Sequence, residues 1–314
     1  MSTSIFKNVL IFGATGEVGS AVARCASSSG AKVWLGMRDI NKQNTWLGKE
    51  EETESDMKRL HADLTDPVSL AAAVKESAAT AAYIYATHSR DGMRSALQAM
   101  RDAGIQHTVF LSTSAVRGDI RAIPRSTFIP WHHAQVEISL EDLGMQHTAV
   151  RPGFFASNPF RLYLEPSKTT AKIFAPEQLH DPIDPQDIGR VCATVLTRPA
   201  HRSSGELKDV QFISGPRRLS QTSMWEIINT CLGRKGKPVV ETVELTEEEY
   251  TGTLEAKGVP DFIAQSLVKS MGDTSLLYAD EDFLPASKNV ENLTANKPTS
   301  FEDFVEREIE KYFP

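Results

Sequence analysis

The residues best suited to chemistry form a short glycine-rich turn near the N-terminus, Gly13-Ala14-Thr15-Gly16-Glu17-Val18-Gly19. Gly13 permits a tight turn, Gly16 lets the backbone approach a diphosphate, and Gly19 lets a following helix pack closely on a sheet. The unpaired N–H groups at the start of such a helix also attract anions. Since many strand-to-helix turns need glycine, the motif predicts a nucleotide site only in the right context.

The segments around the turn supply that context. Residues 7–12 form an almost continuously apolar run, as expected for a strand buried on both faces of a parallel sheet. Residues 16–29 are predicted to form a helix, and a second strand follows at about 32–37. We therefore predict a dinucleotide site whose contacts include Gly13, Thr15, Gly16, Glu17, Val18 and Gly19.

Arg38, just past the second predicted strand, bears on which dinucleotide binds. An acidic residue at this place suits the ribose hydroxyls of NAD, whereas an arginine suits the 2′-phosphate of NADP. A solvated surface arginine is the alternative, and Asp39 could argue for NAD, but it lies one residue further from the strand. We predict NADP(H). Asp63, after the third strand, could bind the adenine amino group or simply form a turn.

The rest of the chain alternates between short apolar strands and helices. Residues 40–56 are polar and acidic and are expected to form a variable surface segment. Further strands are predicted at Arg59–Ala62, Ala81–Ala86, Thr108–Leu111, Thr148–Val150 and Val210–Ser214, with helices near 91–102, 131–142 and 184–196. This alternation predicts βαβ units and an α/β fold with a parallel sheet.

The pattern changes after Arg151 and suggests two parts. A nucleotide-binding core is predicted over residues 1–153, completed by about 184–215. Residues 154–183 and 216–314 are expected to form a smaller, mostly helical lobe on the substrate side.

Composition excludes several classes of protein. The 314 residues carry a formal net charge of -7 and no dense Lys/Arg stripe, so no nucleic-acid partner is expected. No apolar run reaches membrane-spanning length and no secretory leader is recognisable, which predicts a cytoplasmic protein without a membrane partner. Cys25, Cys192 and Cys231 are few and far apart, so neither disulfides nor a metal site are expected.

Candidate catalytic and substrate residues follow the later strands. Ser112 and Ser114 come at the end of the fifth strand, where active-site residues tend to lie, although they could simply cap a loop. Thr87 and His88 follow the fourth strand and should lie near a bound nicotinamide. The side chains expected to wall the substrate side, with burial in the lobe core as the alternative, are Phe154, Phe155 and Tyr163.

These motifs together resemble the NmrA-like group of atypical short-chain dehydrogenase/reductases over nearly the whole chain. The resemblance rests on the glycine spacing and on Met37-Arg38-Asp39, Ala62-Asp63-Leu64-Thr65-Asp66, Phe110-Leu111-Ser112-Thr113-Ser114, His133-Ala134-Gln135-Val136-Glu137, Thr148-Ala149-Val150-Arg151-Pro152-Gly153-Phe154-Phe155 and Pro298-Thr299-Ser300-Phe301-Glu302-Asp303-Phe304. It implies a Rossmann-like, doubly wound parallel sheet with a smaller C-terminal lobe that forms a cleft at the strand ends.

The resemblance also exposes a missing pair. Reductases of this group use Tyr-x-x-x-Lys, but here His133 stands in the lysine position and Ile129 in the tyrosine position. The His-x-x-x-Glu form is similar to quinone-reductase-like members. His133 could bind the cofactor ribose or donate a proton, because an unperturbed histidine pKa of about 6.5 suits either role. It could equally be an ordinary histidine on a helix face.

The resemblance leaves three functions open. The first is an NADPH-dependent reductase acting on a hydrophobic small molecule such as a quinone, enone, cyclic carbonyl or imine. The second is an NADP(H)-sensing regulator that acts on a protein partner without consuming the nucleotide. The third is a non-redox cyclase or isomerase in which bound NADP(H) shapes the pocket.

Overall fold

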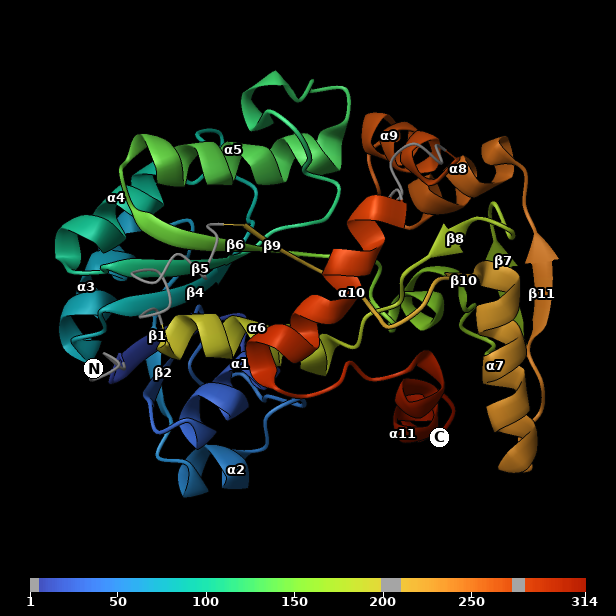
Figure 1. Ribbon diagram of the computed structural model, residues 1–314, viewed down its shortest axis with the longest axis horizontal. Coiled ribbons are helices and arrows are strands. Elements are labelled where there is room, and N and C mark those ends of the chain that lie inside the picture. Colours follow the sequence, from blue (N-terminus) through green and yellow to red (C-terminus); the bar gives the residue numbers. More distant parts are fainter. Residues whose placement is uncertain (1–5, 199–209, 273–279) are drawn as a thin grey trace.

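A parallel sheet of seven strands forms the centre of the molecule (Figure 1), whose computed structural model describes residues 6–198, 210–272 and 280–314. The strand order is β3-β2-β1-β4-β5-β6-β9, and every neighbouring pair is parallel. The strands are β1 (Asn8–Phe12), β2 (Lys32–Met37), β3 (Lys58–His61), β4 (Ala81–Tyr85), β5 (His107–Leu111), β6 (Gln146–Pro152) and β9 (Val210–Ile213). The order reverses direction between β1 and β4, where open α/β sheets bind their ligands.

Helices cover both faces of this sheet. The helices of the core are α1 (Glu17–Ser28), α2 (Lys49–Glu54), α3 (Pro67–Ser77), α4 (Arg94–Ala103), α5 (Phe128–Asp142) and α6 (Pro185–Thr197). Successive side chains of β1 point to opposite faces, as strand geometry requires. Val9 and Ile11 pack in the cluster that contains α1 and α6, whereas Leu10 and Phe12 pack in the cluster that contains α3, α4 and α5. The predicted α/β, Rossmann-like fold is confirmed.

Helices α1 and α6 approach each other very closely on one of these faces. Gly189 of α6 lies against α1, and a Cβ added there would lie 2.3 Å from the Cβ of Ala21. The same atom would lie 3.0 Å from two backbone atoms of α1, so the helices would have to separate. Gly189 therefore sets the distance between α6 and α1. Since α1 follows the glycine-rich turn, this packing also fixes where that turn leads into the helix.

A separate hydrophobic cluster organises the lobe at the right of Figure 1. Large buried side chains such as Tyr163, Trp225 and Tyr250 fill it. The remaining elements are β7 (Thr170–Ile173), β8 (Leu179–His180), β10 (Leu219–Ser220), β11 (Glu241–Glu244), α7 (Gln221–Arg234), α8 (Glu247–Ala256), α9 (Asp261–Gly272), α10 (Asp280–Thr294), α11 (Phe301–Tyr312), a 3₁₀ turn at Ile120–Ala122 and a π-helical turn at Pro159–Tyr163. No helix among the described residues is long and apolar enough to span a bilayer.

Two segments differ from the sequence-based expectation. Helix α10 was expected in the lobe, yet its Val290 packs in the α1/α6 cluster and its Asn289 donates to the Phe212 carbonyl of β9 at 2.8 Å. Residues 40–56, expected to form a variable surface segment, contain helix α2 and the fully buried Leu47. Several acidic residues of this stretch occupy the first turn of α2, where negative charge is favourable. The part of residues 184–215 that falls on 199–209 lies outside the described residues.

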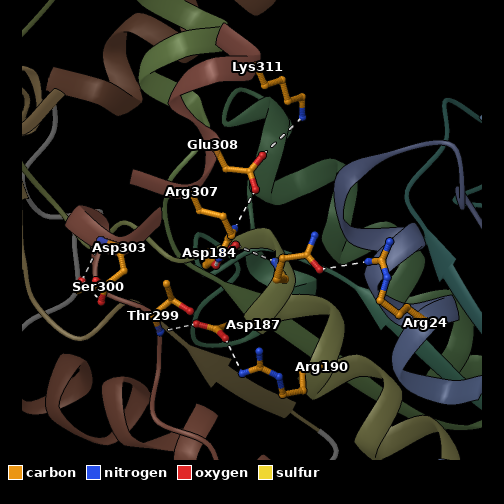
Figure 2. A network of polar contacts seen from close by, with 11 residues as sticks. Arg24, Asp184, Asp187, Arg190, Thr299, Ser300, Asp303, Arg307, Glu308 and Lys311 are labelled. Atoms are coloured by element: carbon orange, nitrogen blue, oxygen red, sulfur yellow. Dashed lines mark hydrogen bonds and ion pairs between the residues drawn. The ribbon is translucent and has the colours of Figure 1, made fainter. Parts of the chain in front are cut away.

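Buried carboxylates of α6 attach the C-terminal segment to the core (Figure 2). Asp184 caps α6 by accepting from the Gln186 N–H, and its other oxygen lies 2.8 Å from the Arg307 guanidinium of α11. Asp187 accepts from the Thr299 N–H at 2.6 Å and from Arg190 at 2.7 Å. Both carboxylates are fully or almost fully enclosed, so removing one partner would leave a buried charge uncompensated.

The α1–α6 contact predicts opposite effects for two glycine-to-alanine changes. Gly189→Ala should lower the free energy of unfolding by about 1–3 kcal/mol, the usual cost of overpacking a core. Gly252→Ala is the matched control, because Gly252 lies inside α8 with open space around it. It should be neutral or stabilising by about 0.5–1 kcal/mol through helix propensity. Urea unfolding of both variants checks this, and equal shifts would contradict the close-packing argument.

Candidate nucleotide-binding site

A cavity of about 690 Å³ opens at the carboxyl ends of β1, β2, β3 and β4. Its size falls in the range of small-molecule and cofactor sites, which is about 300–1,000 Å³. Six of the predicted cofactor residues line it, namely Gly13, Thr15, Arg38, Asp63, Thr87 and His88. The other lining residues include Lys42, Thr65 and Tyr85. Topology thus brings together four loops that are far apart in the sequence.

The glycine-rich turn has the geometry that its three glycines predict. Gly13 adopts a positive φ of 70°, and a Cβ there would lie 2.9 Å from the Tyr85 ring. Gly19 packs against the turn itself, since its Cβ would lie 2.2 Å from the Gly13 carbonyl oxygen. Gly16 has only one neighbour near its Cβ position, that same oxygen at 3.4 Å. Within the protein, Gly16 is therefore tolerant of a side chain, and Gly19 is not.

Helix α1 begins at Gly16 and presents unpaired N–H groups there. No side chain caps this N-terminus. Helix geometry leaves the first N–H groups, at Glu17, Val18 and Gly19, without an intrahelical acceptor. The Val18 side chain is buried in the core, so only its backbone is available to a ligand. An anion such as a diphosphate is the natural partner for such a helix end.

The Glu17 carboxylate contacts the lobe. Its Oε2 accepts from the Ser157 hydroxyl at 2.7 Å and its Oε1 accepts from the Tyr312 hydroxyl at 3.3 Å. Arg161 adds an ion pair at 3.6 Å. A cofactor contact through Glu17 is therefore expected of its backbone, and the side chain connects the first turn of α1 to the C-terminal helix α11.

Two cations line the cavity beyond the end of β2. Arg38 was predicted, and Lys42 joins it from the same loop after β2. Asp39, the residue that could have favoured NAD, accepts from the Asn41 N–H at 2.9 Å and so caps a turn within this loop. Lys42 was visible in the sequence four residues after Arg38. Only the turn capped by Asp39 places it beside the cavity.

Asp63 forms a turn, which is one of the two roles considered for it. Its Oδ1 accepts from the Thr65 N–H at 2.9 Å and from the Thr65 hydroxyl at 2.8 Å, which is a turn-forming arrangement. It also lines the cavity. The contact with an adenine amino group stays a prediction, and the turn is what holds the carboxylate at the cavity edge.

An aromatic cluster extends from the other end of the cavity toward the lobe. The ring of His88 lies 5.2 Å from the ring of His132, and His132 stacks on Phe128 at 5.7 Å. Phe128 in turn meets the edge of Phe262 from α9, whose side chain is 62% exposed. Thr87 lies beside this cluster with an enclosed hydroxyl that has no hydrogen-bond partner among the described residues. A planar ring could pack against this surface.

Ser112 is occupied by a buried ionic network. Its hydroxyl donates to Oε1 of Glu137 at 2.5 Å, and Arg151 binds both oxygens of the same carboxylate. Arg151 also donates to the Val116 carbonyl at 2.9 Å, and all three ionic or hydroxyl side chains are at most 5% exposed. The network fixes the loop that leaves β5. Ser114, two residues on, donates its N–H to the Pro152 carbonyl and is half-buried.

His133 lies on α5 with its ring 5.8 Å from the ring of Phe110. Burial, with a smaller effect from His132, lowers the pKa of His133 from its usual 6.5 to about 3. The pKa of 6.5 expected from sequence is therefore wrong for this environment. The ring is neutral near pH 7, and its enclosed Nδ1 has no partner among the described residues. A neutral ring can make a hydrogen bond to a cofactor, but it holds no imidazolium proton to transfer.

The predicted substrate-side aromatics separate into different surroundings. Tyr163 is 0% exposed and lies in the lobe core beside Tyr250, which is the alternative considered for it. Phe154 packs on that core, with its ring 4.3 Å from His180. Phe155 packs on the α1/α6 cluster of the sheet. Tyr163 is thus a core residue, and a substrate contact of Phe154 or Phe155 stays a prediction.

Asn44 supports the glycine-rich turn and was not singled out from the sequence. It is 7% exposed, and its amide donates to the Ala14 carbonyl of the glycine-rich turn at 2.9 Å. Its side-chain oxygen accepts from the N–H groups of Trp46 and Leu47. An asparagine within a polar stretch gives no sequence signal for such a long-range contact.

The turn geometry predicts that Gly16 and Gly19 fail in different ways. Gly16→Ala should leave the free energy of unfolding within about 0.5 kcal/mol of the native value, as for a harmless substitution. It should nevertheless weaken nucleotide binding, because the new methyl group would stand where the diphosphate approaches. Gly19→Ala should destabilise the fold itself. Thermal unfolding and nucleotide titration of both variants check this, and native binding by Gly16→Ala would show that the diphosphate lies elsewhere.

Comparison with known proteins agrees with the fold and identifies the family. The sequence model of the NmrA-like family matches residues 6–305. A nitrogen metabolite regulation-like protein, bik4 of Gibberella fujikuroi, is 52% identical over 325 aligned positions that cover 100% of both chains. The festuclavine dehydrogenase easG of Aspergillus fumigatus is 27% identical and covers 96% of this chain and 97% of its own.

A solved structure shares the fold. An NADPH-dependent quinone oxidoreductase of Escherichia coli, in complex with NADPH, superposes with a TM-score of 0.70 at 18% identity. The match covers 96% of this chain and 99% of that one. Since the family model spans almost the whole sequence and a relative of 52% identity aligns from end to end, this chain belongs to the NmrA-like family.

Proposed function

We propose that this chain is an NADP(H)-binding regulatory protein that acts on a protein partner and does not turn the nucleotide over. The proposal rests on one observation. The chain has a nucleotide site, but the positions of the usual tyrosine and lysine hold residues that cannot relay a proton in the usual way.

The nucleotide half rests on complementary charge. The N-terminus of α1 offers N–H groups to a diphosphate, and Arg38 and Lys42 offer cations at the end of the cavity where the adenosine ribose would lie. A guanidinium-to-phosphate hydrogen bond contributes about 1.5–3 kcal/mol to binding. The quinone oxidoreductase that shares the fold is described with NADPH bound. NADP(H) is therefore the nucleotide that this site fits best.

The relay half argues against ordinary carbonyl reduction. The tyrosine and lysine positions hold Ile129 and His133, and the neutral His133 ring holds no imidazolium proton near neutral pH. Ser112 cannot replace them readily, because its proton is donated to the Glu137 carboxylate inside a closed network. A general acid contributes about 10²–10⁴ in rate, and none of Ile129, His133 and Ser112 is placed to supply one. The arrangement therefore suits nucleotide binding but lacks the proton donor that ketone reduction needs.

The comparisons favour the same order of hypotheses. The relative at 52% identity carries a regulatory name, whereas the dehydrogenase relative is 27% identical. A bound nucleotide can regulate a partner if it binds one state of the protein better than another.

Reduction of an activated acceptor is the second candidate. The aromatic cluster of His88, Phe128, His132 and Phe262 gives a planar ring a surface beside the cavity. A quinone or iminium needs less help from an enzymatic acid than a plain ketone does. The dehydrogenase relative also supports this candidate.

NADPH deuterated at the nicotinamide separates the hypotheses. We expect the protein to bind NADPH and, with a panel of quinones and cyclic imines, to leave both nucleotide and label unchanged. Deuterium in a product would overturn the regulatory proposal in favour of the reductase. Product formed without NADPH consumption would favour the non-redox cyclase or isomerase. Arg38→Ala is the control, since it should weaken NADPH binding by about 1.5–3 kcal/mol with little effect on NADH.

A further inference from the structure

Arg59 is fastened to the loop that carries the two cations of the cavity. It lies on β3, and its NH1 group donates to the carbonyls of Ile40 and Lys42 at 2.7 and 3.0 Å. Both carbonyls belong to the turn between Arg38 and the start of α2. The Arg59 guanidinium therefore holds the loop backbone at two points, Ile40 and Lys42, and so fixes the position from which the Lys42 side chain extends.

Glu52 of α2 fixes the guanidinium from its other side. Nε and NH2 of Arg59 donate to the two oxygens of Glu52, each at 2.7 Å, in a bidentate pair. The Glu52 side chain is 7% exposed and that of Arg59 is 22% exposed. Bidentate, partly buried pairs of this kind have defined geometry, unlike single ion pairs on an open surface. The loop is thus bonded to an Arg59 side chain that Glu52 itself holds in one position.

Asp39 is a third charged residue that the Arg59–Glu52 pair affects. Its carboxylate caps the Asn41 N–H inside the loop and lies close enough to Arg59 for its charge to help raise the pKa of that guanidinium, after the larger effect of Glu52. Asp39 also lines the cavity. An uncompensated carboxylate there would repel a 2′-phosphate and could accept hydrogen bonds from ribose hydroxyls, which is the NAD arrangement.

We propose that Arg59 and Glu52 are a positioning pair that sets the preference for NADP(H) over NAD(H). The pair holds the loop so that Arg38 and Lys42 face the 2′-phosphate, and it keeps Asp39 turned into the loop with its charge offset. This inference rests on the proposed NADP(H) binding and adds residues that do not touch the nucleotide. Without the pair, the loop is free to rearrange, and the ordering that phosphate binding then requires opposes NADP more than NAD.

The test measures dissociation constants for NADPH and NADH on the same protein. Arg59→Met keeps the aliphatic stem and removes every donor. We expect it to lower the ratio of NADPH to NADH affinity by about tenfold, equivalent to the loss of one charge-assisted hydrogen bond to phosphate. Glu52→Gln should lower the ratio in the same direction by less, because one amide replaces a bidentate carboxylate.

Arg101→Met is the matched control. Arg101 also pairs with a carboxylate, Asp102, and donates to a backbone carbonyl, that of Leu143, but it lies on α4 outside the cavity lining. It should leave the ratio within about twofold, since surface pairs contribute little. Adding Asp39→Asn to Arg59→Met should restore part of the NADPH affinity. A merely structural role for Arg59 would not predict that rescue.

The outcomes separate this inference from the function on which it rests. An unchanged ratio in a folded Arg59→Met or, if that variant does not fold, in Glu52→Gln would overturn the positioning role while leaving NADP(H) binding intact. Equal weakening of NADPH and NADH would also overturn it. If the unaltered protein binds no NADPH, the proposed function fails first and this inference fails with it.

Discussion

The close approach of α1 to the end of β1 is the constraint on which the site depends. A Cβ at Gly19 would come within 2.2 Å of the Gly13 carbonyl oxygen, so only glycine allows the helix to begin where it does. Gly189 imposes a similar limit on the other side of α1, through Ala21. With both contacts in place, α1 begins directly after Gly13 and Thr15, which line the cavity, and the N–H groups of its first turn are fixed before any ligand arrives. Preorganisation of this kind reduces the ordering that binding must otherwise impose.

The same helix end is connected to the far end of the chain. Glu17 accepts hydrogen bonds from Ser157 and Tyr312, and Arg307 pairs with the buried Asp184 a little earlier along α11. The first turn of α1 and the last helix of the protein therefore share a polar contact beside the nucleotide cavity. In the proposed regulator, this contact would connect the expected diphosphate site at the start of α1 to the lobe through the Glu17 carboxylate.

Much of the fold could be predicted from the sequence because its signals are local. The apolar run before Gly13, the glycine spacing and the Asp184-Pro185 helix start each depend on a few neighbouring residues, and each element forms where it was expected. The segment 40–56 could not be predicted, because the roles of Asn44 and Glu52 arise only when the segment folds against the glycine-rich turn and β3. Its polar composition resembles a solvated loop, although several of its charges are paired.

The catalytic roles of candidate residues could not be decided from the sequence for a related reason. Ser112 and His133 have residue types that suit proton transfer, but chemistry depends on what surrounds them. Glu137 of α5, which is paired with Arg151 of β6, accepts the hydrogen bond of the serine, and burial keeps the histidine ring uncharged near neutral pH. Tyr163 likewise lies in an aromatic stretch that could face a substrate or a core, and packing beside Tyr250 decides for the core. Only long-range packing separates these alternatives.

A crystal structure of the protein soaked with NADP⁺ tests the central claim most directly. The account predicts the diphosphate on the N–H groups at the start of α1 and the 2′-phosphate between the side chains of Arg38 and Lys42. The nicotinamide should then lie toward Thr87 and His88, with Ser112 still bonded to Glu137. A nucleotide bound elsewhere, or one whose 2′-phosphate contacts neither cation, would contradict the account.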